Sequence, residues 1–394
     1  MALRLLHTSD WHLGRNFHGA SLLDEQALAM DRIVALSREA SVDLVVIAGD
    51  LYDRAIPPAP AVALFTDTVA RLRADGAAVV AIAGNHDSHV RVSVYDELLT
   101  ALGVSVRGDW RRAAEPVLVH PRTGGAPVAV YPLPYLDPLV DGPGLAATLQ
   151  EKSGAGRLRQ QDAIDLALAA IRADQLQRPG LRSVLIAHAF VAGGRGSESE
   201  RELSVGNVEV VGVPSFSGFD YVALGHLHAP QELDGPRLAY AGSPLPYSFS
   251  EESQRKGVRL VELGADGTLR VESIPLGVGR PLRTLEGTLE DLLADPALEA
   301  TRTAWVRAVL LDDHLPPQAM ARLQQRFPHA VELRHRPNRG AMLESSARSQ
   351  QIRAARGPLE RTLAFFADQQ GRDPLPDESQ LLEQALAAAL QEAD

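Results

Sequence analysis

Apolar and polar positions alternate along the first hundred residues in a way that predicts strands and helices in turn. Short, mostly apolar runs are typical of strands buried on both faces, and they are separated by segments whose apolar side chains recur at helical spacing. The apolar runs are residues 3–6, 44–48 and 78–83, and the helical segments are residues 22–40 and 59–73. This alternation predicts an α/β protein built on parallel strands.

Each of the three apolar runs is followed by polar residues. Asp10 and His12 follow the first run, Asp50 follows the second, and Asn85 and His86 follow the third. The carboxyl ends of parallel strands lie along one edge of a sheet, where α/β enzymes place their sites. We therefore expect these side chains to meet at that edge.

The chain continues with further short strands and one long helix, expected at about residues 158–177. Two of the strands end in histidines, one at His188 and the other at His226 and His228. The segment 193–204 is rich in Gly, Ser and Glu and predicts a mobile loop. The strands are expected at residues 116–119, 128–131, 183–187, 221–224, 238–241, 257–263 and 269–274.

The pattern changes after Pro275. A small α+β module is expected, followed beyond Arg339 by amphipathic helices that are interrupted near residues 371–376. The last helix, at about residues 378–390, either packs on its own domain or docks on another protein. The module combines strands at 281–287, 305–311 and 330–334 with helices at 289–293 and 317–327. The predicted domains are residues 1–278, 279–337 and 338–394.

The composition is that of an ordinary globular protein long enough for two or three domains. The chain has 394 residues, of which 45% are hydrophobic and 23% charged. We expect a cytoplasmic protein with no membrane segment, because no apolar run approaches the roughly 20 residues of a membrane-spanning helix and no signal sequence is recognisable. The absence of cysteine excludes disulfides and thiolate metal sites, so any metal ion must be held by His, Asp, Glu or Asn.

The charge is unevenly distributed. A net charge of −11 argues against a free-standing, non-specific nucleic-acid binder, because Lys and Arg dominate phosphate binding. The stretch 322–361 nevertheless contains nine arginines and three acidic residues. It is either a solvated helical face or a patch that faces a nucleic acid or an acidic partner. The arginines that we consider for DNA or partner contact are Arg322, Arg326, Arg334, Arg336 and Arg339.

The polar residues at the five strand ends together form a ligand set for metal ions. A single histidine at a strand end is most often structural, but agreement among five ends is hard to ascribe to coincidence. Seven side chains are too many for one ion and suit two ions that share a bridging carboxylate, for which Asp50 is central in the order. Mixed oxygen and nitrogen ligands suit Mn, Fe or Zn. The seven are Asp10, His12, Asp50, Asn85, His188, His226 and His228.

The motifs HTSDWHLG, AGDLYD, AGNHD and ALGHLH, with the strand that ends in His188, resemble the motif series of the calcineurin-like metallophosphoesterases. The resemblance covers about residues 1–275 and includes YAGSPLPYSFSEE at 240–252. It implies an α/β four-layer sandwich of two β-sheets flanked by helices. Within the family the details are most similar to nuclease subunits that act with an SbcC-type ATPase, whose capping domain and C-terminal helices match the later segments by layout.

The resemblance also implies how the ligands divide and which residues act on the substrate. One metal ion would be held by Asp10, His12 and His228, the other by Asn85, His188 and His226, with Asp50 between them and Mn²⁺ as the expected metal. His86 would lie over the scissile phosphate, where it stabilises the transition state or protonates the leaving oxygen. Asp53 would orient His86 and favour its charged form.

The expected function is a metal-dependent DNA nuclease of DNA repair and recombination. It would cut duplex DNA as an exonuclease and single-stranded or hairpin DNA as an endonuclease, with a water activated by two metal ions. The expected partners are DNA and an SbcC-type ATPase, with which a homodimer forms a heterotetramer. The helices expected at 58–73 and 92–102 either form the dimer contact or pack on their own sheet.

Two other functions fit the same residues. A phosphodiesterase of nucleotides or small molecules would share every metal ligand, and the Arg-rich segment is what favours DNA. A non-catalytic scaffold is disfavoured by the complete ligand set and His86.

Overall fold

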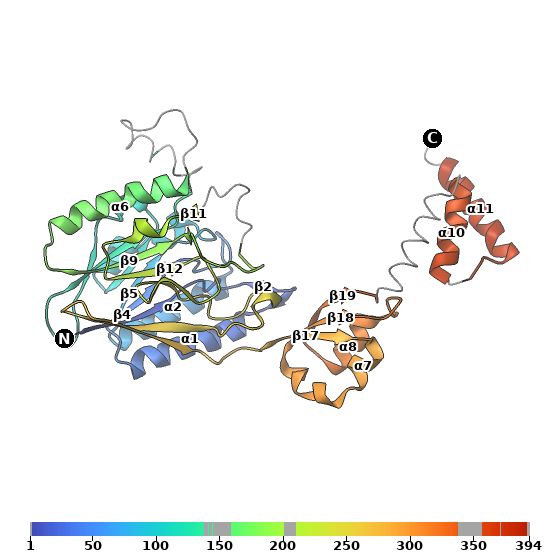
Figure 1. Ribbon diagram of the computed structural model, residues 1–394, viewed down its shortest axis with the longest axis horizontal. Helices are drawn as coiled ribbons and strands as arrows, with labels where there is room; N and C mark the ends of the chain where they lie inside the picture. Colours follow the sequence, from blue (N-terminus) through green and yellow to red (C-terminus); the bar gives the residue numbers. More distant parts are fainter. Residues whose placement is uncertain are drawn as a thin grey trace. The chain divides into compact units, whose positions relative to one another are not determined.

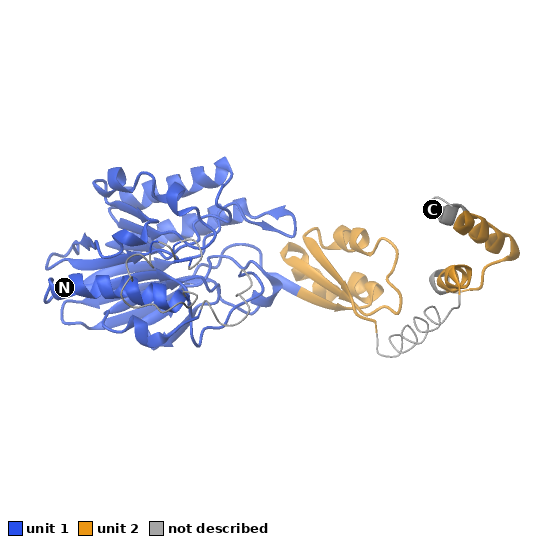
Figure 2. Ribbon diagram, turned by 90° about the horizontal axis from the view of Figure 1, so that it is seen from above, with its two compact units in different colours: residues 1–283 blue, residues 284–394 orange. Residues whose placement is uncertain are grey.

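Two compact units, residues 1–283 and 284–394, divide the chain in the computed structural model (Figure 2). The structure describes residues 2–137, 141, 144, 159–200, 210–337, 357–370 and 372–391. None of the helices in these ranges is both long and apolar enough to cross a bilayer.

The first unit contains a six-stranded sheet with the order β16-β15-β1-β4-β5-β6. Strands β1 to β6 of this sheet pair in parallel, as the apolar runs predict, while β15 and β16 add an antiparallel edge beside β1. The strand β6 was not predicted from the sequence. The bounds are β1 (Ala2–Thr8), β4 (Leu44–Ile47), β5 (Ala78–Ile82), β6 (Val104–Arg107), β15 (Gly257–Gly264) and β16 (Leu269–Pro275).

A second six-stranded sheet has the order β13-β14-β12-β9-β8-β7. Its four inner strands are parallel and its two edge strands antiparallel. The two sheets face each other across an apolar core in which Leu5 and Val46 of one sheet pack with Val184 and Ile186 of the other. The bounds are β7 (Val117–Val119), β8 (Val128–Leu133), β9 (Arg182–His188), β12 (Tyr221–Gly225), β13 (Gln231–Asp234) and β14 (Leu238–Tyr240).

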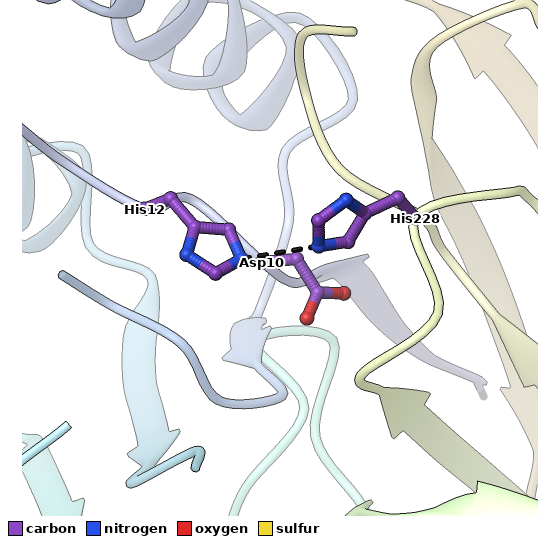
Figure 3. A group of neighbouring side chains, drawn as sticks. All are labelled: Asp10, His12 and His228. Atoms are coloured by element: carbon purple, nitrogen blue, oxygen red, sulfur yellow. Dashed lines mark hydrogen bonds between the residues drawn. The ribbon is translucent and has the colours of Figure 1, made fainter. Parts of the chain in front are cut away.

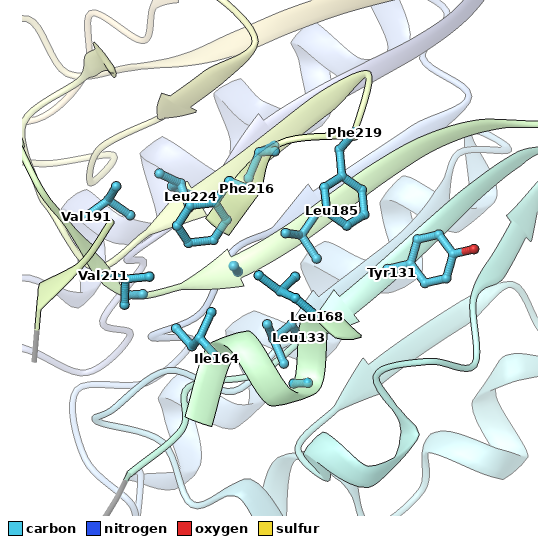
Figure 4. Close-up of a cluster of buried hydrophobic side chains, with 14 of the residues drawn as sticks. Tyr131, Leu133, Ile164, Leu168, Leu185, Val191, Val211, Phe216, Phe219 and Leu224 are labelled. Atoms are coloured by element: carbon cyan, nitrogen blue, oxygen red, sulfur yellow. The ribbon is translucent and has the colours of Figure 1, made fainter. Parts of the chain in front are cut away.

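Helices cover the outer faces of both sheets (Figure 1). The helices α1 (Leu23–Glu39) and α2 (Ala59–Ala74) lie on the first sheet, and α6 (Gln160–Leu176) lies on the second. Figure 4 shows the core beneath α6, where Ile164 and Leu168 meet apolar side chains of the second sheet. The predicted fold class, two β-sheets flanked by helices, is confirmed. Two small strand pairs complete the unit, β2 (Asn16–Phe17) with β3 (Ala20–Ser21), and β10 (Phe190–Val191) with β11 (Val210–Val211).

The helix expected at residues 92–102 is instead two short helices, α3 (His89–Ser93) and α4 (Asp96–Thr100). The buried carboxylate of Asp96 explains the break, because it accepts hydrogen bonds from Ser105 Oγ and Val106 N, both at 2.8 Å. These bonds tie the start of α4 to β6 and set its direction.

A three-stranded sheet lies at the start of the second unit, with the first two residues of β17 counted in the first unit. Its strands are β17 (Leu282–Gly287), β18 (Trp305–Leu310) and β19 (Ala330–His335). Helices α7 (Leu289–Ala294) and α8 (Ala319–Arg326) share one apolar core with this sheet. The strands and helices predicted here are confirmed, with ends shifted by up to two residues. Further on, α10 (Pro358–Gln370) and α11 (Pro376–Gln391) pack against each other, and the helical stretch expected just after Arg339 lies outside the described residues.

Candidate metal centre

The five predicted strand ends meet at one edge of the two packed sheets. The first sheet supplies the residues after β1, β4 and β5, and the second supplies those after β9 and β12. Asn85 and His86 are half-buried, and the other six side chains are buried. The structure therefore brings together all seven predicted ligands and His86.

The backbone at several of these positions adopts a conformation that side chains rarely take. Asp10, His12, Asp50 and His226 all have positive φ angles, between 45° and 106°. Such residues cost about 1–3 kcal/mol each and persist at functional sites, where the surrounding structure holds them. All four are predicted ligands, so these strained backbone conformations are gathered at the centre.

Glycines before the ligands make room for the neighbouring segments. A Cβ atom on Gly84 would lie 2.2 Å from Asp50 Oδ1, and one on Gly225 would lie 1.7 Å from the carbonyl oxygen of Ala48. Because neither position can hold a side chain, the pairs Gly84-Asn85 and Gly225-His226 are a steric requirement of the centre.

Asp10, His12 and His228 form the first ligand set (Figure 3). The Nε2 atoms of His12 and His228 face each other at 3.1 Å. Ligand atoms of all three residues lie within 4.8 Å of one another. Ser9 Oγ donates to Asp10 Oδ2 at 2.6 Å and helps to fix the carboxylate.

The second set is expected to be Asn85, His188 and His226, and the structure places these side chains next to one another. Asn85 Oδ1 lies 2.9 Å from His188 Nε2 and 3.2 Å from His226 Nδ1. His188 Nδ1 donates to the carbonyl of Ala48 at 2.8 Å, since a carbonyl can only accept. In a neutral ring, Nε2 of His188 is then unprotonated and presents its lone pair to the centre.

Asp50 lies between the two sets. Its Oδ2 atom is 3.4 Å from His12 Nε2 and 3.5 Å from His188 Nε2. Its Oδ1 atom accepts a hydrogen bond of 2.9 Å from the main-chain N–H of His86. The Oδ2 oxygen of Asp50 therefore faces one histidine from each set.

The protonation of the centre follows from its burial. Burial, together with repulsion from neighbouring imidazoles, lowers the pKa of His12, and it lowers that of His226 to about 3. Burial also raises the pKa of Asp10, and the Asp50 carboxylate beside it raises it further. Burial also raises the pKa of Asp50, but the neighbouring His188 and His86 have the larger effect, so the pKa of Asp50 is lowered.

This environment fits divalent cations. Neutral imidazole nitrogens, carboxylate oxygens and an amide oxygen face one another at hydrogen-bond distance. Lone pairs and carboxylate charges that are buried this close together repel one another unless a cation lies between them. Mn, Fe and Zn accept such a mixture of nitrogen and oxygen ligands.

His86 lies beside the first set and the shared carboxylate, with its ligand atom within 4.8 Å of those of His12 and Asp50. We expected the carboxylate of Asp53 to orient it. The bond between these residues instead runs from His86 Nδ1 to the main-chain carbonyl of Asp53, at 3.0 Å. The Asp53 carboxylate accepts a hydrogen bond from Arg15 Nη1 at 3.2 Å.

Arg15 is a residue that the sequence reasoning missed. Its Nη2 donates to the carbonyl of Ser199 at 2.9 Å, and its guanidinium carbon lies 4.9 Å from the centre of the Tyr247 ring. Arg15 therefore connects three segments of the wall of the centre. It directly follows the HTSDWHLG motif, which is the only sequence signal that could have drawn attention to it.

Asp87 was also missed. Its carboxylate accepts main-chain hydrogen bonds from Gly84, Leu51 and Tyr52, at 2.9–3.0 Å. Burial and the charge of Asp50 raise its pKa to about 7. Asp87 joins the turns after β4 and β5, and its place at the end of the AGNHD motif is a signal that could have identified it.

A polar cluster behind His228 was missed as well. It consists of Ser199, Glu200, Glu251 and Lys256, and two of these residues come from the segment expected to be a mobile loop. Residues 193–200 of that segment are described, and Ser199 and Glu200 are hydrogen-bonded to His228, while its remaining residues lie outside the described ranges.

The predicted arginine patch is less open than expected. Arg322 and Arg334 pair with Glu290 and Glu332, at 3.1 Å and 2.5 Å. Arg336 pairs with Glu286, and Arg326 donates to main-chain carbonyls of Leu292 and Asp295. Arg339 lies outside the described residues.

Two family models match this chain. The calcineurin-like phosphoesterase family matches residues 3–230, and a C-terminal family, SbcD_C, described as the type 5 capsule protein repressor C-terminal domain, matches residues 278–369.

Three solved structures are similar at low identity. TT1561 of Thermus thermophilus is 13% identical, with 69% of this chain and 99% of that chain covered and a TM-score of 0.38. GAP50, the anchor in the inner membrane complex of Plasmodium, is 11% identical, with 86% and 98% covered and a TM-score of 0.43. A dimetal phosphatase from Danio rerio is 14% identical, with 70% and 99% covered and a TM-score of 0.39.

Proposed function

The chain belongs to the calcineurin-like phosphoesterase family, and on that basis we propose that it is a metal-dependent nuclease that hydrolyses DNA phosphodiesters. The observation that carries the proposal is the position of Asp50, whose Oδ2 atom faces His12 of one ligand set and His188 of the other at 3.4 Å and 3.5 Å. Two adjacent sites that share one carboxylate are the arrangement that two-metal phosphoryl transfer requires.

The first ion would be held by Asp10, His12 and His228, and the second by Asn85, His188 and His226, with Asp50 shared. Mn²⁺ is our choice among the metals that this mixture of ligands accepts. When bound, the ions would activate a water molecule and neutralise charge on the phosphate oxygens.

His86 would act on the leaving group. Its Nδ1 atom donates to the Asp53 carbonyl, so the ring is held with Nε2 as the atom that can reach substrate. Protonated at Nε2, the ring donates a proton to the departing sugar oxygen or stabilises the charge of the transition state. The Arg15–Asp53 pair supports the segment that carries this carbonyl.

DNA as the substrate, and an SbcC-type ATPase as the partner, are supported by the C-terminal match to the SbcD_C family. A homodimer is supported by apolar side chains around α3 and α4 that are 62–72% exposed. They are Val90, Val94, Tyr95, Leu98 and Leu102. We propose that two copies of the nuclease bind two ATPase subunits.

The proposal is tested by a Mn²⁺-dependent cleavage assay. Linear duplex, hairpin and single-stranded DNA are compared with a nucleotide phosphodiester, each with and without an SbcC-type ATPase and ATP. We expect cleavage of DNA in all three forms, and none in the presence of a chelator.

The other outcomes separate the alternatives. Cleavage of the nucleotide diester without cleavage of any DNA would make the protein a small-molecule phosphodiesterase. Mn²⁺ binding without cleavage of any substrate would leave a scaffold on the same fold.

A further inference from the structure

The polar cluster behind His228 forms a chain of hydrogen bonds that runs from the imidazole ring to a buried ion pair. Ser199 Oγ lies 2.5 Å from His228 Nδ1, and it also donates to Glu251 Oε1. The Glu251 side chain is fully buried, and Lys256 Nζ pairs with its Oε2 atom at 2.5 Å. A buried carboxylate with an ammonium group at that distance is ionised and can only accept hydrogen bonds.

The direction of the hydrogen bonds follows from this pair. Ser199 has one hydroxyl proton, and because Glu251 can only accept, that proton points to Glu251. Ser199 Oγ must then accept from His228, so Nδ1 of His228 carries a proton. In the neutral ring Nε2 is left unprotonated, and this is the atom that faces His12 in the first ligand set.

We propose that Ser199 and Glu251 are positioning residues for His228, in which the Ser199 hydroxyl transmits the charge of Glu251 to the ring and fixes Nε2 as the metal-binding atom. The inference rests on the proposed function for the role of His228 as a metal ligand. A carboxylate that acts on a ligating histidine directly is a common support for metal sites, and here a serine stands between the two.

Two further hydrogen bonds hold His228 through its main chain. Glu200 Oε1 accepts from the His228 N–H at 2.8 Å, and Lys256 Nζ donates to the His228 carbonyl at 2.7 Å. Residues 199–200 are far from His228 in sequence, so the segment after β10 is part of the first metal site.

The test compares Ser199→Ala with Ser199→Thr, which keeps a hydroxyl. Binding of Mn²⁺ alone to the full-length protein is measured by calorimetry, with bound metal counted by elemental analysis. Removal of such a supporting group typically lowers metal affinity about 10–100-fold. We expect Ser199→Ala to weaken one of two Mn²⁺ sites by this factor and to leave the other unchanged, and Ser199→Thr to restore most of the affinity.

Ser105→Ala is the matched control. Ser105 is also buried and also donates to a carboxylate, that of Asp96, but its hydrogen bonds lie in β6 and α4. The Ser105→Ala variant should bind Mn²⁺ with the same affinities as the unchanged protein.

A second measurement does not depend on metal. In metal-free protein labelled with ¹⁵N-histidine, with the His228 signals assigned by their absence in His228→Gln, we expect Nδ1 to carry the proton in the unchanged chain and not in Ser199→Ala. An unchanged tautomer together with two unchanged Mn²⁺ affinities in Ser199→Ala would overturn the inference. If the unchanged chain binds no Mn²⁺, the proposed function fails, and the tautomer still decides whether Ser199 orients His228.

Discussion

At the scale of single residues, Asp50 and His86 have separable roles. Asp50→Ala removes the carboxylate that both ligand sets share, so we expect loss of bound Mn²⁺ and of cleavage together. His86→Ala removes a group beside the metals that holds none of them in our assignment, so we expect retained metal and a loss of cleavage of about 10²–10⁴-fold, the usual contribution of a general acid. Elemental analysis and cleavage rates of the two variants check this, and empty sites in His86→Ala would contradict it.

His7 predicts a dependence of stability on pH. It is buried between the sheets, with Nδ1 2.8 Å from the Tyr221 hydroxyl oxygen and Nε2 3.0 Å from the Leu224 carbonyl oxygen. Burial, with a contribution from the charge of Arg259, lowers its pKa from 6.5 to about 3. Below pH 6.5 the unfolded chain takes up a proton at His7 and the folded chain does not, so stability falls as the pH falls toward 3.

The size of this dependence is bounded. One group contributes at most about 1.4 kcal/mol per pH unit to the free energy of unfolding. Urea unfolding of chelated protein between pH 6 and pH 4 should therefore show a shallower slope for His7→Gln than for the unchanged chain. The exposed His120, changed to Gln, serves as the control and should alter the slope less. Equal slopes in His7→Gln and the unchanged chain would show that His7 is not the proton-linked group.

At the scale of elements, the strands and their ends could be predicted, because continuous apolar runs followed by Asp, Asn or His carry both the fold and the site. The hydrogen bonds that complete the site could not be predicted from the sequence. Ser199 reaches His228 across 29 residues and Glu251 across 52. Serine and glutamate are so common on surfaces that no local pattern marks this pairing, and Asp53 shows that even a recognised motif residue can act through its main chain.

The same limit applies to helices α3 and α4. Their apolar spacing is compatible with one helix at 92–102, and only the bonds from Ser105 and Val106 to Asp96 explain why there are two. A carboxylate that bonds to a later strand is a tertiary contact, which local periodicity does not contain.

The strand end at Gly225 gives a prediction for β12. A Cβ atom there would overlap the Ala48 carbonyl and lie 3.0 Å from His188 Nδ1. We expect Gly225→Ala to lower the free energy of unfolding by about 3 kcal/mol or more, the upper part of the range for overpacked sites, and to impair metal binding. Urea unfolding and metal analysis check this. Gly357→Ala should change neither, because an added Cβ there would meet no atom within 4 Å apart from its chain neighbours. A stable, metal-replete Gly225→Ala protein would refute the steric argument.

At the scale of the whole molecule, the metal centre lies in the first unit of the chain, and the arginines considered for DNA contact belong to the second. Arg334 and Arg336 lie on β19 or just after it in the second unit, with exposed side chains that pair with acidic neighbours. If they also bind phosphates, Arg334→Gln with Arg336→Gln should weaken DNA binding and reduce its salt dependence by about one unit of slope for each phosphate that is no longer bound. Hydrolysis of a small phosphodiester should be unchanged.

Arg302→Gln is the control for that pair. Arg302 is a half-exposed arginine of the same unit whose partner is Glu299, and it lies outside the Arg-rich stretch. DNA titrations at several salt concentrations compare the variants. Identical slopes for the double variant and the control would show that Arg334 and Arg336 are solvated surface residues and not phosphate contacts.

The shared carboxylate has one more consequence, which concerns folding. Asp50 follows a strand of the first sheet and His188 ends a strand of the second, so ions held between them would tie together two layers that are otherwise joined by apolar packing. A ligand that binds only the folded chain stabilises it by about 2.7 kcal/mol at one hundred times its dissociation constant. The melting temperature should therefore rise with free Mn²⁺ and fall on chelation, which would make the supply of metal a determinant of how long the folded protein survives.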